Sequence, residues 1–177
     1  MLLLFCFNNG RIDGRTVVQK LMYFAQLLVP MSKKLHFGPH YYGPYSAELA
    51  AMLDNLVALR FLRTEIRRTA REREMYSYFL TDDGRAIASK IADKKKDSKR
   101  IRAVVEKCKS LSGLNPDTLS FAAKANHILS QKKQTYTRSQ VIAEGKSFGW
   151  RLTPGQVNSG VNVLLDLGLA KRKKSVK

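Results

Sequence analysis

The feature that most limits what this chain can fold into is a change of hydrophobic period after about residue 60. Up to about residue 60 the apolar residues recur at steps of three and four, which predicts a helix with one buried face. Residues 61–67 and 75–80 then have the composition of β-strands, and the charged residues between them predict a hairpin. Thr81 precedes another helical pattern, whose first turn its hydroxyl can cap. The predicted order is therefore helix, hairpin, helix.

Two further helices are expected before this region. The apolar run at residues 2–7 predicts a buried first helix, and residues 14–29 carry an apolar face until Pro30 ends the pattern. Ser46 is placed as the N-cap of the third helix. Three helices, a hairpin and a helix are typical of a winged helix, which is a variant of the helix-turn-helix. The predicted fold class is mainly α with a small β-hairpin.

The remainder of the chain predicts a second helical unit. A highly charged helix is expected at residues 93–110, and the glycine, asparagine and proline of residues 111–116 end it. Three amphipathic segments follow, at residues 117–131, 138–147 and 154–167, and they indicate a second unit of helix-turn-helix type. We expect a winged-helix domain at residues 1–92, a basic connecting helix or linker at 93–113, and a C-terminal helical domain at 114–177.

The charge of the chain favours a polyanionic partner. Its 177 residues include 32 Lys and Arg against 14 Asp and Glu, a formal charge of +18. Residues 1–59 carry 5 basic and 3 acidic side chains, residues 60–110 carry 16 and 8, and residues 111–177 carry 11 and 3, which gives net charges of +2, +8 and +8. The basic surface should therefore follow a nearly neutral scaffold, and nucleic acid is the leading partner.

The predicted hairpin carries a dense group of arginines. A winged helix places its third helix in the major groove and its hairpin near phosphates, and guanidinium groups suit phosphate. Most exposed residues of the third helix are small or acidic, which disfavours contact with DNA. Glutamates among the arginines leave a solvated ribbon of ion pairs as an equal alternative. The candidate contacts in this region are Arg63, Arg67, Arg68, Arg71 and Arg73, with Tyr45 and Ser46 at the start of the third helix.

The last predicted helix offers a second candidate surface. The side opposite its apolar stripe carries amides, which can bond the edge of adenine, and basic residues follow it. Exposed amides are more often merely solvated, so that alternative stays open. The candidates are Gln156, Asn158, Asn162, Lys171 and Arg172. We expect the hairpin arginines to contribute more than these amides.

Three tyrosines surround a glycine and a proline ahead of the third helix. Tyr41, Tyr42 and Tyr45 could stack on bases or could pack against the core, and packing is the outcome that we expect.

The sequence gives no sign of catalysis. It lacks a glycine-rich phosphate loop and a nucleophile elbow, and Asp82 and Asp83 are explained as helix caps. His36 and His40 are separated by Gly38-Pro39, which prevents the helical spacing of a metal pair. We expect no enzyme activity, no metal and no cofactor.

Two further features indicate a soluble, cytoplasmic protein. Cys6 and Cys108 are isolated in sequence, which favours reduced thiols. No segment approaches the roughly 20 apolar residues of a membrane-spanning helix.

Three sequence elements resemble known families. They are Gln19-Lys20-Leu21-Met22-Tyr23, Tyr42-Gly43-Pro44-Tyr45-Ser46, and Phe79-Leu80-Thr81-Asp82-Asp83-Gly84. With them the chain resembles the YwgA-like winged-helix proteins and, more distantly, the Panacea (SocA-like) antitoxin domains, which share the first two elements. The hairpin and the third element are similar to the wing of MarR-type repressors. The resemblance implies a winged-helix fold over residues 10–92 and, by analogy, a repressor or antitoxin role.

The leading prediction is a DNA-binding protein that regulates transcription. We expect a homodimer, since a two-fold protein matches two half-sites on a duplex. The alternatives are an antitoxin-like module whose basic face binds an acidic protein, and an RNA-binding protein that recognises shape and phosphates.

Overall fold

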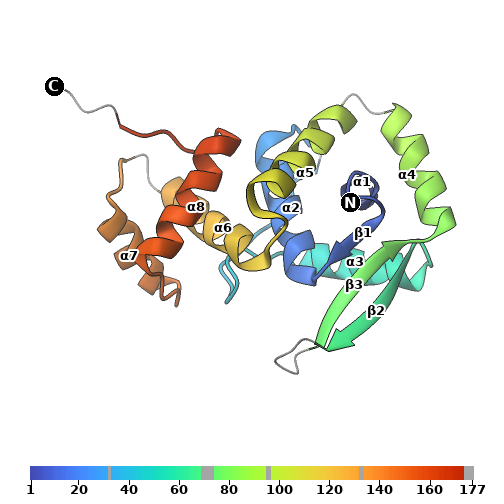
Figure 1. Ribbon diagram of the computed structural model, residues 1–177, viewed down its shortest axis with the longest axis horizontal. Coiled ribbons are helices and arrows are strands. Elements are labelled where there is room, and N and C mark those ends of the chain that lie inside the picture. Colours follow the sequence, from blue (N-terminus) through green and yellow to red (C-terminus); the bar gives the residue numbers. More distant parts are fainter. Residues whose placement is uncertain (32, 69–73, 95–96, 132–133, 174–177) are drawn as a thin grey trace.

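The structure is a computed structural model, and it describes residues 1–31, 33–68, 74–94, 97–131 and 134–173. It is mainly helical with one small antiparallel sheet, which confirms the predicted fold class (Figure 1). The sheet and α4 lie at one end of the molecule and α7 and α8 at the other. The elements are α1 (Leu2–Cys6), β1 (Arg11–Asp13), α2 (Arg15–Leu28), α3 (Ala47–Ala58), β2 (Leu62–Arg68), β3 (Glu74–Leu80), α4 (Asp82–Lys94), α5 (Ser98–Ser112), α6 (Pro116–Gln131), α7 (Arg138–Ser147) and α8 (Pro154–Leu167).

The sheet has three strands in the order β1-β3-β2, and both pairs are antiparallel. Strands β2 and β3 form the predicted hairpin, with Arg63 opposite Phe79. Strand β1 was not predicted from the sequence, and it places Arg11 on the other side of Phe79. It contains three residues, of which only Ile12 is apolar, so no strand period could be recognised. The predicted contacts Arg71 and Arg73 lie outside the described residues.

Helix α2 is the centre of the core. Its residues Val18, Leu21 and Phe24 are 0 % exposed. It contacts α3, α5 and α6, and its apolar residues join those of α1, the sheet and α8 in one hydrophobic cluster. The expected burial of the first helix is confirmed, since Leu2 to Phe5 are all buried. A smaller cluster around Trp150 lies among α6, α7 and α8.

The predicted connecting helix is packed against the rest of the molecule. Helix α5 contacts α1 and α2, and its residues Val104, Val105 and Cys108 are buried. The domain boundaries at residues 92 and 113 stay a prediction.

Several predicted helix ends are confirmed by their hydrogen bonds. The hydroxyl of Ser46 accepts a bond from the Leu49 N–H at 3.3 Å, and that of Thr81 accepts one from the Gly84 N–H at 3.1 Å. Helix α8 ends at Gly168, whose φ of +75° is the left-handed conformation that glycine adopts readily.

Helices α6 and α8 pass unusually close to each other at Gly160. A Cβ atom at that position would lie 2.6 Å from the carbonyl oxygen of Phe121, so only glycine permits this approach.

Candidate nucleic-acid interface

Two polar residues of α2 fix the loop that precedes α3. The Gln19 amide donates to the Ser46 carbonyl at 2.8 Å and accepts from the Ser46 N–H at 2.9 Å. The Lys20 ammonium donates to the Pro44 carbonyl at 2.7 Å. Both side chains are almost fully buried. The first two of the sequence elements that resemble known families are therefore bonded to each other in space.

This arrangement removes one predicted contact. Ser46 is only 1 % exposed, and its hydroxyl is occupied as the cap of α3. The prediction that Ser46 contacts nucleic acid is therefore wrong, since a buried cap cannot reach a ligand. Tyr45 is half-buried, and its ring centroid lies 4.9 Å from that of His40.

The other two tyrosines of the loop face solvent. Tyr41 is 73 % exposed and Tyr42 is 40 % exposed, and their rings contact each other edge to face. The expectation that they pack against the core is wrong. Gly43 and Pro44 are the buried residues of this part of the loop. A Cβ atom on Gly43 would lie 3.0 Å from the Lys124 side chain, so the loop passes close to α6 at this point.

Lys20 is a buried cation whose described hydrogen-bond partner is a carbonyl, and no carboxylate pairs with it among the described residues. Burial lowers the pKa of Lys20 to about 7, and repulsion from Lys124 contributes to the shift. Lys124 is itself half-buried, with its ammonium 5.7 Å from the Trp150 ring centroid. The loop therefore rests on a lysine that loses its proton unusually easily.

The hairpin arginines are partly neutralised by a neighbour. Arg63 and Arg67 both form ion pairs with Glu65, the second at 3.6 Å. The Arg63 guanidinium also lies over the Phe79 ring, 4.2 Å from its centroid. Arg68 is exposed and stands opposite Glu74 across the hairpin. These pairs support the alternative of a solvated ribbon for the described part of the hairpin.

Gln156 has a structural role at the start of α8. Its amide oxygen accepts a bond from the Thr153 N–H at 2.9 Å, and the Thr153 hydroxyl accepts one from the Gln156 N–H at 3.3 Å. This reciprocal capping box fixes the first turn of α8. Gln156 is therefore less suited to contact a base than the sequence indicated.

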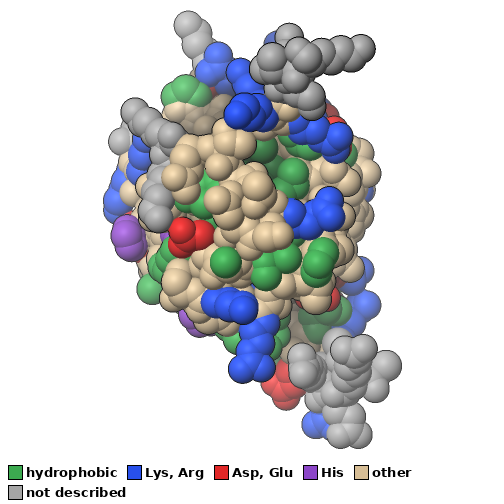
Figure 2. Space-filling view, turned by 90° about the vertical axis from the view of Figure 1, so that its left-hand side faces the viewer, with side chains coloured by type: hydrophobic (Ala, Val, Ile, Leu, Met, Phe, Trp, Pro, Cys, Tyr) green, Lys and Arg blue, Asp and Glu red, His purple; other side chains and the backbone are tan. Residues whose placement is uncertain are grey.

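The other C-terminal candidates line one groove. Asn158 and Asn162 are exposed and lie one turn apart on the same side of α8. Lys171 and Arg172 follow α8 and line the same groove, which has a volume of about 720 Å³. The groove continues to Tyr136 and the start of α7. Figure 2 views this end of the molecule, where basic side chains surround apolar ones.

Arg138, the first residue of α7, was not among the residues predicted from the sequence. It is exposed and lines the groove together with the amides of α8. Its position at the start of a predicted helix was visible in the sequence, but its proximity to residues 158–172 depends on how α7 packs on α8.

The cations of this groove have no described acidic partner. In the part of the chain that the structure describes, the ion pairs involve basic residues no further along than Arg100. Arg138, Lys171 and Arg172 therefore keep their charge available to a ligand, whereas Arg63 and Arg67 share theirs with Glu65.

No group of three or more His, Cys, Asp or Glu side chains in the described ranges is placed to hold a metal ion. None of the helices in those ranges combines the length and the apolarity needed to cross a membrane.

The chain is similar in part to a known bacterial protein. No family model matches the chain. The chain is 38 % identical over 81 residues to the uncharacterized protein YwgA of Bacillus subtilis (strain 168). The aligned region covers 45 % of this chain and 47 % of that protein, so the chain spans about half the length of the relative that it matches. The similarity supports the predicted resemblance to YwgA-like proteins over these 81 residues.

Proposed function

We propose that this protein binds duplex DNA as a regulator of transcription, with α8 as the helix that enters the major groove. The observation that carries the proposal is the groove of about 720 Å³ in which exposed asparagines lie beside cations that form no ion pair with a described acidic residue. Asparagine can bond adenine through both its donor and its acceptor. Lysine and arginine beside it would hold the phosphates and set the orientation on the duplex.

The local architecture supports α8 in this role. In a helix-turn-helix the second helix of the pair lies in the major groove, while the first crosses the backbone. Helices α7 and α8 follow each other in this way, and each begins with a capping box. Close packing of α8 on α6 at Gly160 holds the helix rigidly, which reduces the conformational cost of binding.

The hairpin is proposed as a second, weaker contact, as in a winged helix. Arg63 and Arg67 would have to exchange Glu65 for phosphate, and this exchange reduces the net gain. We therefore place the main contact in the C-terminal groove, which is the reverse of the order expected from the sequence.

DNA is favoured over RNA by the position of the amides. The major groove of an A-form duplex is too deep and narrow for side chains on a helix to read.

A homodimer would place two copies of α8 on two half-sites, and light scattering would measure the mass of the particle.

Fluorescence anisotropy with a labelled duplex tests the proposal. We expect the protein to bind the duplex at about 50 mM salt. The logarithm of the affinity should fall linearly with the logarithm of the salt concentration, because binding releases counterions. Lys171→Ala with Arg172→Ala should weaken binding to all sequences and reduce the salt slope by up to about 0.9 for each lost phosphate contact. Asn158→Ala with Asn162→Ala should instead reduce discrimination among sequences, by roughly 1 to 3 kcal/mol for each lost base contact.

A charge-matched variant provides the control. Lys90 on α4 and Lys99 on α5 are exposed and do not line the groove. Replacing both with Ala removes the same charge and should leave the affinity close to that of the wild type. Equal weakening by the control would reject the groove as the contact. If the protein binds no duplex at low salt, the proposal of DNA binding is wrong and an acidic protein partner is favoured.

A further inference from the structure

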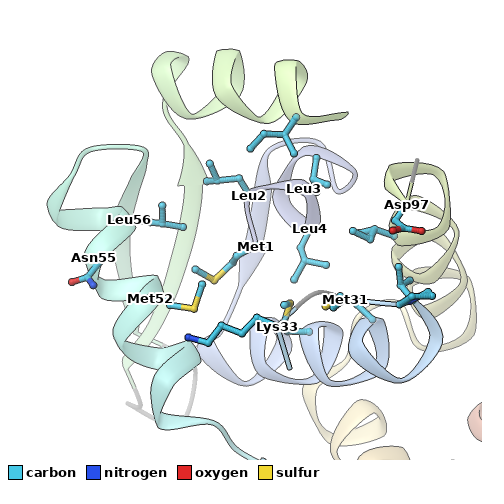
Figure 3. A pocket seen from close by; sticks show the side chains of 16 residues that line it. Met1, Leu2, Leu3, Leu4, Met31, Lys33, Met52, Asn55, Leu56 and Asp97 are labelled. Carbon is cyan, nitrogen blue, oxygen red and sulfur yellow. The ribbon is translucent and has the colours of Figure 1, made fainter. Parts of the chain in front are cut away.

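A large apolar cavity lies at the opposite side of α2 from the C-terminal groove. It has a volume of about 640 Å³, is open on one side, and is bordered by α1, the second half of α2, α3, α4 and the start of α5. Figure 3 shows Leu2, Leu4, Met31 and Met52 directed toward this space. Cavities of about 300 to 1,000 Å³ with mainly apolar walls are typical of small-molecule sites.

The lining of the cavity is unusual in its methionines. The sequence contains five, and four of them line this cavity: Met1, Met22, Met31 and Met52. Methionine is flexible and polarizable, so it adapts to apolar groups of different shapes and is over-used at promiscuous binding surfaces. The fifth, Met75, lies on β3 and is not part of the lining.

The floor of the cavity is recessed. Leu2 is 8 % exposed and Met22 9 %, so each keeps a small area that water still contacts. Met52, at 39 %, is the most exposed of the Leu, Ile, Val and Met residues of the lining. A small molecule can reach this floor directly, whereas a second copy of the chain would have to insert a side chain past the rim.

The charges at the rim are already paired. The Lys33 ammonium lies 2.5 Å from a carboxylate oxygen of Glu48, and the Asp97 carboxylate lies 3.4 Å from the Arg100 guanidinium. Asn55 is the other polar residue of the lining, and Figure 3 shows its side chain pointing away from the cavity. A charged ligand would therefore find no unpaired partner among the described lining residues.

We propose that this cavity is a binding site for an uncharged, mainly apolar small molecule. The proposal is independent of DNA binding, since none of the lining residues belongs to the C-terminal groove. Burial of ligand area against the recessed walls supplies the affinity, at about 25 cal/mol for each Å² removed from water.

The methionines provide a direct test in the unmodified protein. We label their methyl groups with carbon-13 and add N-phenyl-1-naphthylamine, an uncharged aromatic probe. The NMR signals of Met22, Met31 and Met52 should shift in a saturable way, while that of Met75 should not. Shifts of equal size at Met75, or no saturable shift at any methionine, would overturn the proposal.

A pair of variants on α3 locates the site. Met52→Trp should fill the cavity and weaken the binding of the probe, measured by its fluorescence, at least about tenfold. Leu59→Trp is the control, because Leu59 is 64 % exposed at the end of the same helix and does not line the cavity. Equal affinity in the two variants would reject the site. Methionine shifts that follow protein concentration without probe would show that a second copy fills the cavity, which also overturns the proposal.

Discussion

Replacing Lys20 with methionine should change how the stability of the protein depends on pH. The usual pKa of a lysine is 10.5, and burial lowers that of Lys20 to about 7. Between these values the unfolded chain holds the proton and the folded chain releases it. The free energy of unfolding should therefore rise with pH from about 7 to about 10.5 and should not vary from this cause below pH 7.

The size of the effect follows from this interval. One pH unit corresponds to about 1.4 kcal/mol, so the full interval from about 7 to 10.5 gives an upper limit of about 5 kcal/mol. Between pH 7 and pH 9 the wild type should gain on the order of 2 kcal/mol. The Lys20→Met variant lacks this gain, and it loses the bond to the Pro44 carbonyl, which costs about 1 to 3 kcal/mol at every pH.

Urea denaturation at pH 7, 8 and 9 measures the gain in stability with pH and the constant loss caused by the missing hydrogen bond. The free energy of unfolding of the wild type minus that of Lys20→Met should increase at each step, by on the order of 2 kcal/mol in total between pH 7 and pH 9. Lys90→Met, on the exposed side of α4, should remain parallel to the wild type. If the Lys20→Met curve is also parallel to the wild type, the buried lysine does not titrate in this range and the argument from its burial is refuted.

Three further variants test the packing of the C-terminal part of the chain. Gly160→Ala should destabilise the protein by roughly 1 to 3 kcal/mol, because its Cβ would lie 2.6 Å from the Phe121 carbonyl oxygen. Gly155→Ala on the same helix meets nothing within 4 Å and should stabilise it by up to about 1 kcal/mol; equal urea midpoints for the two would contradict the close approach. Trp150→Phe removes the indole bond to the His40 carbonyl, 2.7 Å long, and should lower stability by roughly 1 to 3 kcal/mol in the same assay. A midpoint unchanged by that substitution would show that the bond contributes nothing.

The sequence predicted local structure well because helix and strand periods are local properties. The buried side of α2 shows where this reasoning ends. The apolar Leu27 is 44 % exposed, while the polar Gln19 and Lys20 are buried. The loop of residues 38–46 covers the polar side of the helix, and no period within α2 could reveal that cover. Strand β1 was not predicted either, because its partner β3 lies far along the chain and a local pattern cannot reveal that pairing.

The candidate site was predicted in part. The amides Asn158 and Asn162 and the basic Lys171 and Arg172 were selected from sequence, and the structure brings them into one groove. The neutralisation of the hairpin arginines by Glu65 depends on side-chain geometry, which the sequence left open between two alternatives. The apolar cavity was not foreseen, because its walls come from five helices whose packing no single segment encodes.

Two hydrogen bonds that join residues near the start of the chain to residues beyond α5 also set an order of events during synthesis. Trp150 and His40 are 110 residues apart, and Tyr23 bonds Asn126 across 103 residues. At roughly 5 to 20 residues per second, the ribosome releases these partners with a delay of roughly 5 to 20 seconds. During that time the aromatic side of α2 has emerged without its cover. The nascent chain therefore depends most on chaperones in this interval, before its last three helices are made.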